Sequence, residues 1–207
     1  MNADFCPACS ALQPPPEGAD LFSFLGVPFS LEVEDGKLQR LYHERSKKLH
    51  PDRFLSAGGK LLEYSQARSA LLNKAYRTLR DPEERLRYLL AIELESLGLS
   101  EAKAAERNVP VELAEEYFEM QEALAEGDQS ALGRVHARLA EVAAENEKKL
   151  AELRGRWERE GLGEARARGD KKDERSAFAR DLEKALQLKS YLFRMEENLG
   201  RAAAVRN

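Results

Sequence analysis

The chain has 207 residues, of which 43% are hydrophobic, 34% charged and only 7% aromatic, and its formal net charge is −4 at pH 7. Ala, Leu, Glu, Lys and Arg dominate, which is typical of helical bundles rather than sheets, in one large domain or two small ones. The net charge gives no general case for binding nucleic acid or an anionic membrane, and no stretch reaches the ~20 apolar residues of a transmembrane helix. The first residues lack the basic start and apolar run of a signal peptide, so we expect a cytoplasmic protein.

Residues 1–19 contain a triple proline and no helical periodicity, so we predict a flexible tail and linker. They include the only two cysteines of the sequence, Cys6 and Cys9. In a reducing cytosol a C-x-x-C pair indicates metal binding or redox chemistry before a structural disulfide. A structural zinc ion takes four ligands, and the chain offers no second pair. Zinc held within one chain, a metal shared between two chains and a vestigial pair therefore stay open. No strand-helix-strand pattern supports a thioredoxin-like role.

A short helix and a basic helix come next. Asp20 can cap a helix over residues 21–25. A helix from about residue 34 to 49 then carries five Lys or Arg and one Glu between positions 37 and 49, although the whole chain is negative. Steps of three and four separate an apolar face from a basic one. The apolar face holds Leu38, Leu41, Tyr42, Leu49 and the stem of Arg45, and the basic face holds Arg40, His43 and Lys47.

The tripeptide His50-Pro51-Asp52 follows this helix directly. Proline disfavours the α conformation in the residue before it, so His50 should be extended and the helix should end near Leu49. A His and an Asp two residues apart invite an acid-base interpretation. No third catalytic partner, glycine-rich phosphate loop or metal constellation accompanies them. The simpler alternative is a loop in which Asp52 caps the next turn.

Two further helices complete the first half of the chain. A helix over about residues 60–79 has an apolar stripe that can pack antiparallel against the basic helix. The next helix should start with Asp81 as N-cap, Pro82 at the first position and Glu84 three residues after the cap. It should end at Leu97-Gly98. The stripe of the first of these helices consists of Leu61, Tyr64, Arg68, Leu71, Leu72, Ala75 and Leu79.

The second half begins with an acidic helix that starts at Val109-Pro110. Between Arg107 and Arg134 there are seven Asp or Glu and no Lys or Arg. Apolar residues are interleaved among these acids, so this helix should have one covered face. We assign Tyr117, Met120 and Leu124 to that covered face, in the core.

A long helix follows Gly127-Asp128, and its apolar residues at steps of three and four from Leu132 to Trp157 suit a bundle seam. A break with three glycines precedes the last helix, at about residues 176–199. Three amphipathic helices should form an antiparallel three-helix domain. The apolar set of the last helix includes Phe178, Leu182, Leu186, Leu192, Phe193 and Leu199.

Four separate pieces of the first half resemble the J domain of DnaJ-type co-chaperones. They are Asp20–Leu25, the basic helix, His50-Pro51-Asp52 and Leu72–Pro82. Within J proteins the chain most resembles the HscB family of iron-sulfur cluster assembly, from about residue 20 to 199. The resemblance implies an all-α fold with an L-shaped arrangement of two domains, which we place at residues 20–98 and 109–203.

The resemblance also implies how the first domain acts. J domains dock on a DnaK/HscA-type chaperone, stimulate its ATPase and so lock the client in place. The chain would then be an ATPase activator rather than an enzyme, because ATP binds to the partner. The residues that match the family's docking surface are His50, Pro51, Asp52, Arg40, His43 and Lys47, with Lys48 and Arg53 beside them.

In HscB-like proteins the C-terminal domain binds an IscU-type scaffold, on which iron-sulfur clusters are built. Ala114 and Glu115 fall where the family commonly has larger apolar residues. We expect a monomer or weak dimer that binds neither nucleic acid nor membrane. A general J protein with other clients, which commonly has a Gly/Phe-rich segment, and a metal or redox protein acting through Cys6 and Cys9 are the alternatives. The expected scaffold-binding residues are Ala114, Glu115, Phe118, Glu119, Glu122 and Tyr191.

Overall fold

The computed structural model describes residues 4–99 and 110–205. Within them all regular secondary structure is helical, apart from an isolated bridge between Phe5 and Leu12, so the predicted all-α fold is confirmed. The chain divides into two compact units, which are Met1–Ile92 with Trp157–Lys171 and Glu93–Arg156 with Lys172–Asn207. No helix of the described residues is long and apolar enough to cross a membrane.

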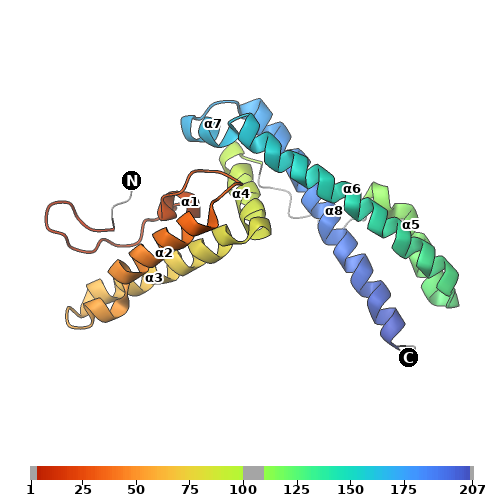
Figure 1. Ribbon diagram of the computed structural model, residues 1–207, viewed down its shortest axis with the longest axis horizontal. Helices are drawn as coiled ribbons and strands as arrows, with labels where there is room; N and C mark the ends of the chain where they lie inside the picture. The colour runs from red at the N-terminus through yellow and green to blue at the C-terminus, as the bar shows by residue number, and fades with distance from the viewer. Residues whose placement is uncertain (1–3, 100–109, 206–207) are drawn as a thin grey trace. The chain divides into compact units, whose positions relative to one another are not determined.

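The first unit is built on a helical hairpin. The helices α2 (Asp35–Leu49) and α3 (Gly59–Arg80) lie side by side and antiparallel, with a short 3-10 turn η1 (Pro51–Phe54) between them (Figure 1). The helices α1 (Leu21–Leu25) and α4 (Pro82–Leu97) flank this hairpin along the chain. Large apolar side chains fill the space between them, as expected for a packed core. Fully buried members include Phe22, Leu25, Leu38, Leu49, Leu72, Leu79, Leu86 and Leu89.

The predicted helix starts are confirmed by their caps. The Asp20 carboxylate accepts a hydrogen bond from the Ser23 N–H at 2.8 Å. The Asp81 carboxylate accepts from the N–H groups of Glu83 and Glu84, both at 2.9 Å. Each carboxylate satisfies backbone donors that the first turn of a helix leaves unpaired.

The segment that we expected to be a flexible tail instead packs on the first unit. Arg68 of α3 is buried, and its guanidinium donates to the Asp4 carboxylate at 2.6 Å. It also donates to the backbone carbonyls of Gln13 at 2.6 Å and Pro14 at 2.8 Å. A buried guanidinium needs a paired charge and satisfied donors. The N-terminal segment supplies both, so residues 4–14 are a structural part of this unit.

A helix that we did not predict lies within the three-glycine break. The helix α7 (Leu162–Arg168) is flanked by Gly161 and Gly169, which have φ values of 61° and 77°. These left-handed conformations favour glycine, because a Cβ atom there is strained. Leu162 and Ala165 of α7 are fully buried, so tertiary packing stabilises a helix of only two turns.

The segment 157–171 packs in the first unit, although the sequence suggested that it belongs to the C-terminal domain. The Trp157 indole N–H donates to the Phe29 carbonyl at 3.0 Å. The Glu158 carboxylate accepts from the Leu31 N–H at 2.6 Å. These hydrogen bonds pair backbone groups of Phe29 and Leu31, which have no partner within a helix or sheet. The predicted ranges 20–98 and 109–203 stay predictions, but the end of α6 and α7 are built into the first unit.

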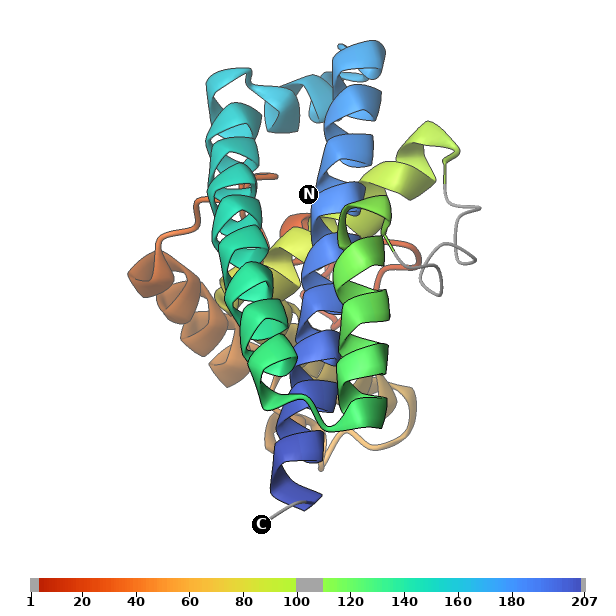
Figure 2. The ribbon, with the colours of Figure 1, turned by 90° about the vertical axis from the view of Figure 1, so that its right-hand side faces the viewer.

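The second unit contains three long helices. They are α5 (Ala114–Glu126), α6 (Gln129–Arg159) up to Arg156, and α8 (Lys172–Val205), with a 3-10 turn (Val111–Leu113) before α5. These helices lie side by side (Figure 2). Part of the predicted start at Val109-Pro110 lies outside the described residues. The core cluster contains Leu113, Met120, Val135, Leu139, Val142, Tyr191, Leu192 and Met195.

The predicted core of α8 needs one correction. Phe193 is 61% exposed, whereas its neighbour Leu192 is buried. Tyr191, Leu192 and Met195 face the core, and at about 100° per residue Phe193 lies about 200° from Tyr191 around the helix, so it points away from the core. Phe193 is therefore a surface residue rather than a member of the bundle core.

Candidate functional site

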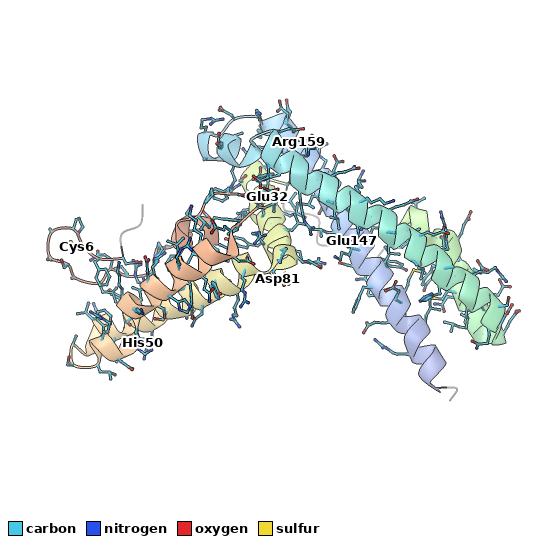
Figure 3. The ribbon with its side chains drawn as sticks, in the orientation of Figure 1. Cys6, Glu32, His50, Asp81, Glu147 and Arg159 are labelled. Atoms are coloured by element: carbon cyan, nitrogen blue, oxygen red, sulfur yellow. The ribbon has the colours of Figure 1, made fainter. Side chains whose placement is uncertain are left out.

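The loop between α2 and α3 is held by its own histidine. His50 has φ −59° and ψ 130°, the extended conformation that a following proline favours. Its Nδ1 accepts a hydrogen bond from the Asp52 N–H at 3.3 Å, so His50, rather than Asp52, caps the turn. The Asp52 side chain is 77% exposed, with Oδ2 3.5 Å from the same nitrogen. The loop thus presents an exposed carboxylate at the tip of the hairpin, where Figure 3 labels His50.

Two serines of α3 hold the C-terminal end of α2 by hydrogen bonds. The hydroxyl groups of Ser65 and Ser69 donate to the Leu49 carbonyl at 2.6 and 3.0 Å. The last carbonyls of a helix have no partner inside it, so these bonds satisfy an acceptor next to the tripeptide. These serines were not among the predicted site residues. Their spacing of one helical turn beside the apolar stripe of α3 was the available signal.

The predicted basic face of α2 is open to solvent. Arg45 points away from it and donates to the Asp4 carboxylate and the Phe24 carbonyl. An ion pair on this face, between Arg40 and Glu34, is 3.6 Å long and joins two exposed side chains, so it contributes little. The residues of the predicted face that are exposed are Arg40, His43, Lys47 and Lys48, together with Arg53 of the turn.

A pair of stacked tyrosines ties the basic helix to α3. The rings of Tyr42 and Tyr76 are stacked with centroids 4.3 Å apart. The Tyr42 hydroxyl donates to the Asn73 side-chain oxygen at 2.9 Å. Aromatic stacking and a cross-helix hydrogen bond hold α2 in a fixed rotation about its axis. This rotation keeps His43, the residue after Tyr42, directed outward.

The acidic helix α5 presents one aromatic side chain to solvent. Phe118 is 70% exposed, and its ring lies edge-on to Tyr117 with centroids 5.9 Å apart. Glu115 and Glu122 are exposed one turn before and after it, whereas Ala114 and Glu119 are half-buried. We call Glu115, Phe118, Glu119 and Glu122 the α5 surface. Met120 lies in the core and Tyr117 and Leu124 pack against it, as predicted.

Some of the acids of α5 are already paired. Glu119 accepts from Arg134 at 3.1 Å, and Glu116 from Arg138 at 3.2 Å. In the described part of the chain, Glu115 and Glu122 make no ion pair. These two carboxylates of the α5 surface are exposed to solvent.

Tyr191 does not join this surface. It is only 9% exposed and belongs to the core cluster, with its ring centroid 6.3 Å from that of Tyr117. Burial raises the pKa of its phenol, and the nearby Tyr117 adds to the effect. Tyr191 is therefore a core residue, because the face of α8 that carries it packs against α5, and its predicted role in scaffold binding stays a prediction.

An apolar residue that we did not select lies near the α5 surface in sequence. Val111 is 89% exposed and precedes Phe118 by seven residues, which is two helical turns. The sequence signal was this spacing. A search for apolar residues at seven-residue steps among the acids would have found it.

The two cysteines lie in a closed turn of the N-terminal segment, where Figure 3 labels Cys6. The Cys6 N–H donates to the Ala11 carbonyl, and the Ser10 N–H to the Cys6 carbonyl, both at 2.8 Å. Hydrogen bonds from the Cys9 and Ala8 N–H groups and from the Cys9 thiol lower the pKa of the Cys6 thiol. Cys6 is half-buried and Cys9 is exposed.

No metal site that includes this pair is complete among the described residues, and zinc binding here stays a prediction. Across residues 4–99 and 110–205, no three His, Cys, Asp or Glu side chains are grouped so that they could hold a metal ion. A structural zinc ion takes four ligands, of which the pair provides two. We therefore derive no step through a metal at this turn.

Known proteins similar to this chain share one name. The chain is 33% identical over 127 residues to the human protein named "Iron-sulfur cluster co-chaperone protein HscB", covering 61% of this chain and 52% of that protein. It is 30% and 32% identical to HscB homologs of Aromatoleum aromaticum and Cupriavidus taiwanensis, covering 71% and 74% of those proteins. The chain spans about half the length of its human, mouse and Arabidopsis relatives. No family model matches the chain.

The crystal structure of human co-chaperone protein HscB supports the same fold. Its TM-score is 0.63 at 24% identity, over 96% of this chain and 91% of that one. The relatives that are 30% or more identical and covered to two thirds or more are named co-chaperones. The chain belongs to the HscB family of co-chaperones.

Proposed function

We propose that the chain stimulates the ATPase of a DnaK/HscA-type chaperone and delivers an IscU-type scaffold protein to it during iron-sulfur cluster assembly and transfer. The supporting observation is the exposed Asp52 carboxylate on a fixed turn beside an exposed basic face. Family membership adds the cluster-assembly role, since the relatives are named HscB co-chaperones. ATP hydrolysis belongs to the partner, and this chain acts as its activator.

The trigger in this proposal is Asp52. An exposed carboxylate can pair with an arginine of the partner through two charge-assisted hydrogen bonds. His50 caps the turn and Pro51 fixes its backbone, so little conformational entropy is lost on binding. Ser65 and Ser69 hold the same turn through the Leu49 carbonyl. Because the loop is pre-organised, it presents the Asp52 carboxylate to the partner in one defined orientation.

The basic face brings the partner into position. Because Arg45 is paired with Asp4, the helix from Lys37 onward leaves four exposed Lys or Arg against one exposed Glu, Glu44. Such a local positive patch on a negative chain attracts an acidic surface and orients it during encounter. This patch would set the association rate, whereas Asp52 would set the effect on hydrolysis.

The α5 surface binds the scaffold in this proposal. Phe118 is the anchor, since a large aromatic side chain that becomes buried on binding supplies most of the affinity of a small interface. Glu115 and Glu122 form its charged rim, and Glu119 is pre-positioned by Arg134. Ala114 contributes little, because it is small and half-buried.

The experiment that tests this division is Asp52→Asn. We expect it to abolish stimulation of the chaperone ATPase and to leave scaffold affinity unchanged, because the α5 surface lies on another unit. Asp35→Asn is the matched control, since Asp35 is an exposed acid at the other end of α2. Full stimulation by the Asp52 variant would refute the proposed trigger. Loss of scaffold binding as well would show that the two surfaces do not act separately.

A further inference from the structure

Two exposed apolar side chains lie in the segment that begins the second unit. Among residues 4–99 and 110–205, four large apolar side chains are exposed, and Val111 and Phe118 are two of them. Val111 is 89% exposed, more than any of the other three. A single apolar residue on a surface needs no explanation, whereas several that share one face indicate a binding surface. The orientation of Val111 relative to Phe118 therefore decides what this residue means.

The 3-10 turn before α5 directs Val111 outward. The Leu113 N–H donates to the Pro110 carbonyl at 2.9 Å, and the Ala114 N–H donates to the Val111 carbonyl. The Leu113 side chain is fully buried in the core of the second unit. At three residues per turn, Val111 and Leu113 point about 120° apart, so a buried Leu113 keeps Val111 off the core. The turn is thus anchored without the Val111 side chain.

Val111 and Phe118 share one side of this segment. Side chains three residues apart in a 3-10 helix eclipse each other, so Val111 lies in line with Ala114. In the α-helix that follows, Ala114 and Phe118 are four residues apart and are neighbours on one face. Ala114 is half-buried and has only a methyl group. Val111, Glu115, Phe118 and Glu122, at steps of four, three and four, therefore form one exposed row of alternating apolar and acidic residues.

The charge of this row limits which partner can cover it. Glu115 and Glu122 are exposed, and no Lys or Arg occurs between Arg107 and Arg134. A second copy of this chain in an isologous contact would bring acids against acids, which is unfavourable. A partner that has Lys or Arg beside an apolar surface would be complementary to the row.

We propose that Val111 is a second apolar anchor of the α5 surface. The scaffold partner would present two apolar contacts roughly 10–12 Å apart, the rise of the residues from Val111 to Phe118, with a Lys or Arg between them that faces Glu115. This inference rests on the proposed binding of the scaffold by the α5 surface. It makes Val111 a specificity-determining residue, because a partner that matches Phe118 alone would lose the second contact.

Two substitutions of Val111 test the anchor by calorimetric titration of the full chain with purified scaffold. Val111→Ala should weaken binding roughly fivefold to tenfold, because two methyl groups leave the interface. Val111→Thr keeps the shape of the side chain but brings a hydroxyl group into an apolar contact, so it should weaken binding roughly threefold. Leu55→Ala is the matched control, since Leu55 is an exposed apolar residue of the first unit. It should leave scaffold affinity unchanged.

The cation expected between the two anchors is tested by Glu115→Lys. This substitution should lower the association rate with the scaffold roughly tenfold at low salt, and the difference should shrink as the salt concentration rises. Glu152→Lys is the control, because Glu152 is an exposed acid of α6. It should leave the rate within about twofold. Equal effects of the two substitutions would overturn the proposed position of the cation.

The outcomes separate this inference from the proposed function. Scaffold binding that Phe118→Ala weakens and Val111→Ala leaves unchanged would overturn the second anchor alone. A full chain that does not bind the scaffold would contradict the proposed function and, with it, the partner assigned here. A dimer that Val111→Ala dissociates, seen by sedimentation at unchanged scaffold affinity, would make a second copy the occupant and would also overturn the proposal.

Urea unfolding shows whether the Val111 variants keep their stability. Both variants should unfold at the same urea concentration as the original chain, because the Val111 side chain is exposed and Leu113 anchors the turn. A clear loss of stability would place Val111 in the core and would overturn its role as an anchor for a partner.

Discussion

The hairpin tip and the α5 surface are both proposed to bind a protein, but different levels of structure create them. At the tip, residues that are neighbours in sequence determine the structure. Pro51 favours an extended backbone at His50, and the His50 ring caps its own turn. On α5, an aromatic residue is exposed only because other residues of that helix face the core. A local motif therefore specifies the tip, whereas tertiary packing specifies the α5 surface.

The largest effect should come from reversing the charge of the basic face. Arg40→Glu combined with Lys47→Glu should lower the association rate with the chaperone roughly a hundredfold at low salt, because repulsion replaces steering. Stopped-flow binding at several salt concentrations measures this rate. Scaffold affinity should not change, because the basic face and the α5 surface are proposed to act separately.

Lys149→Glu is the control for this double variant, since Lys149 is an exposed cation of α6. It should leave the association rate within about twofold, because its charge lies outside the proposed encounter surface. An association rate that the double variant leaves unchanged would remove the basic face from the proposed docking surface.

The next effect concerns the anchor of the α5 surface. Phe118→Ala should weaken scaffold binding by roughly tenfold to a hundredfold, because burial of a phenylalanine side chain contributes about 1.5–3 kcal/mol. Calorimetric titration of the scaffold measures this change. ATPase stimulation without scaffold should stay at its original level.

Two controls show whether exposure alone explains this loss. Phe193→Ala removes another exposed phenylalanine, on α8, and should leave scaffold affinity unchanged. Tyr191→Phe keeps a buried ring and removes only its hydroxyl, so it should change the affinity less than twofold. If Tyr191→Phe weakened binding as much as Phe118→Ala, the family pattern would describe this surface better than the structure does.

We expect the smallest effect on activity from a substitution that clearly lowers the free energy of unfolding. A Cβ atom at Gly163 would lie 1.9 Å from the Phe29 carbonyl oxygen, so backbone must shift to admit it. Gly163→Ala should lower the free energy of unfolding by about 2 kcal/mol. Urea unfolding measures this, and stimulation by the folded fraction should be unchanged.

Gly133→Ala is the matched control, because an added Cβ there meets nothing within 4 Å beyond the adjoining backbone of its own helix. This glycine is exposed on α6, where alanine favours the helix by about 1 kcal/mol. The two substitutions should therefore act with opposite signs. Destabilisation by both would mean that the contact of Gly163 with Phe29 is not the cause.

Features that depend on residues close in sequence could be predicted. The caps at Asp20 and Asp81, the extended His50 and the apolar stripe of α3 each follow from a spacing of four residues or fewer. The identity of the capping group in the tip did not follow. Both His50 and Asp52 can accept a backbone hydrogen bond, and only the folded turn shows which one does.

Features that depend on residues far apart in sequence were not predicted, because their contacts exist only in the folded chain. The N-terminal segment is ordered by an ion pair between Asp4 and Arg68, which lie 64 residues apart in sequence. The helix α7 is too short to be stable alone and exists because Leu162 is buried. Tyrosine has an apolar ring and a polar hydroxyl, so it occurs both in cores and on surfaces. The packing of Tyr191 against α5 is what buries it in this chain.

The most direct test of the proposed function is the steady-state ATPase rate of the host's DnaK-type chaperones with this protein, with and without the cluster scaffold. We expect protein and scaffold together to stimulate hydrolysis more than the two separate effects combined, and His50→Gln to remove this synergy. Stimulation that is the same with and without scaffold would contradict it and would indicate a J protein that serves other clients.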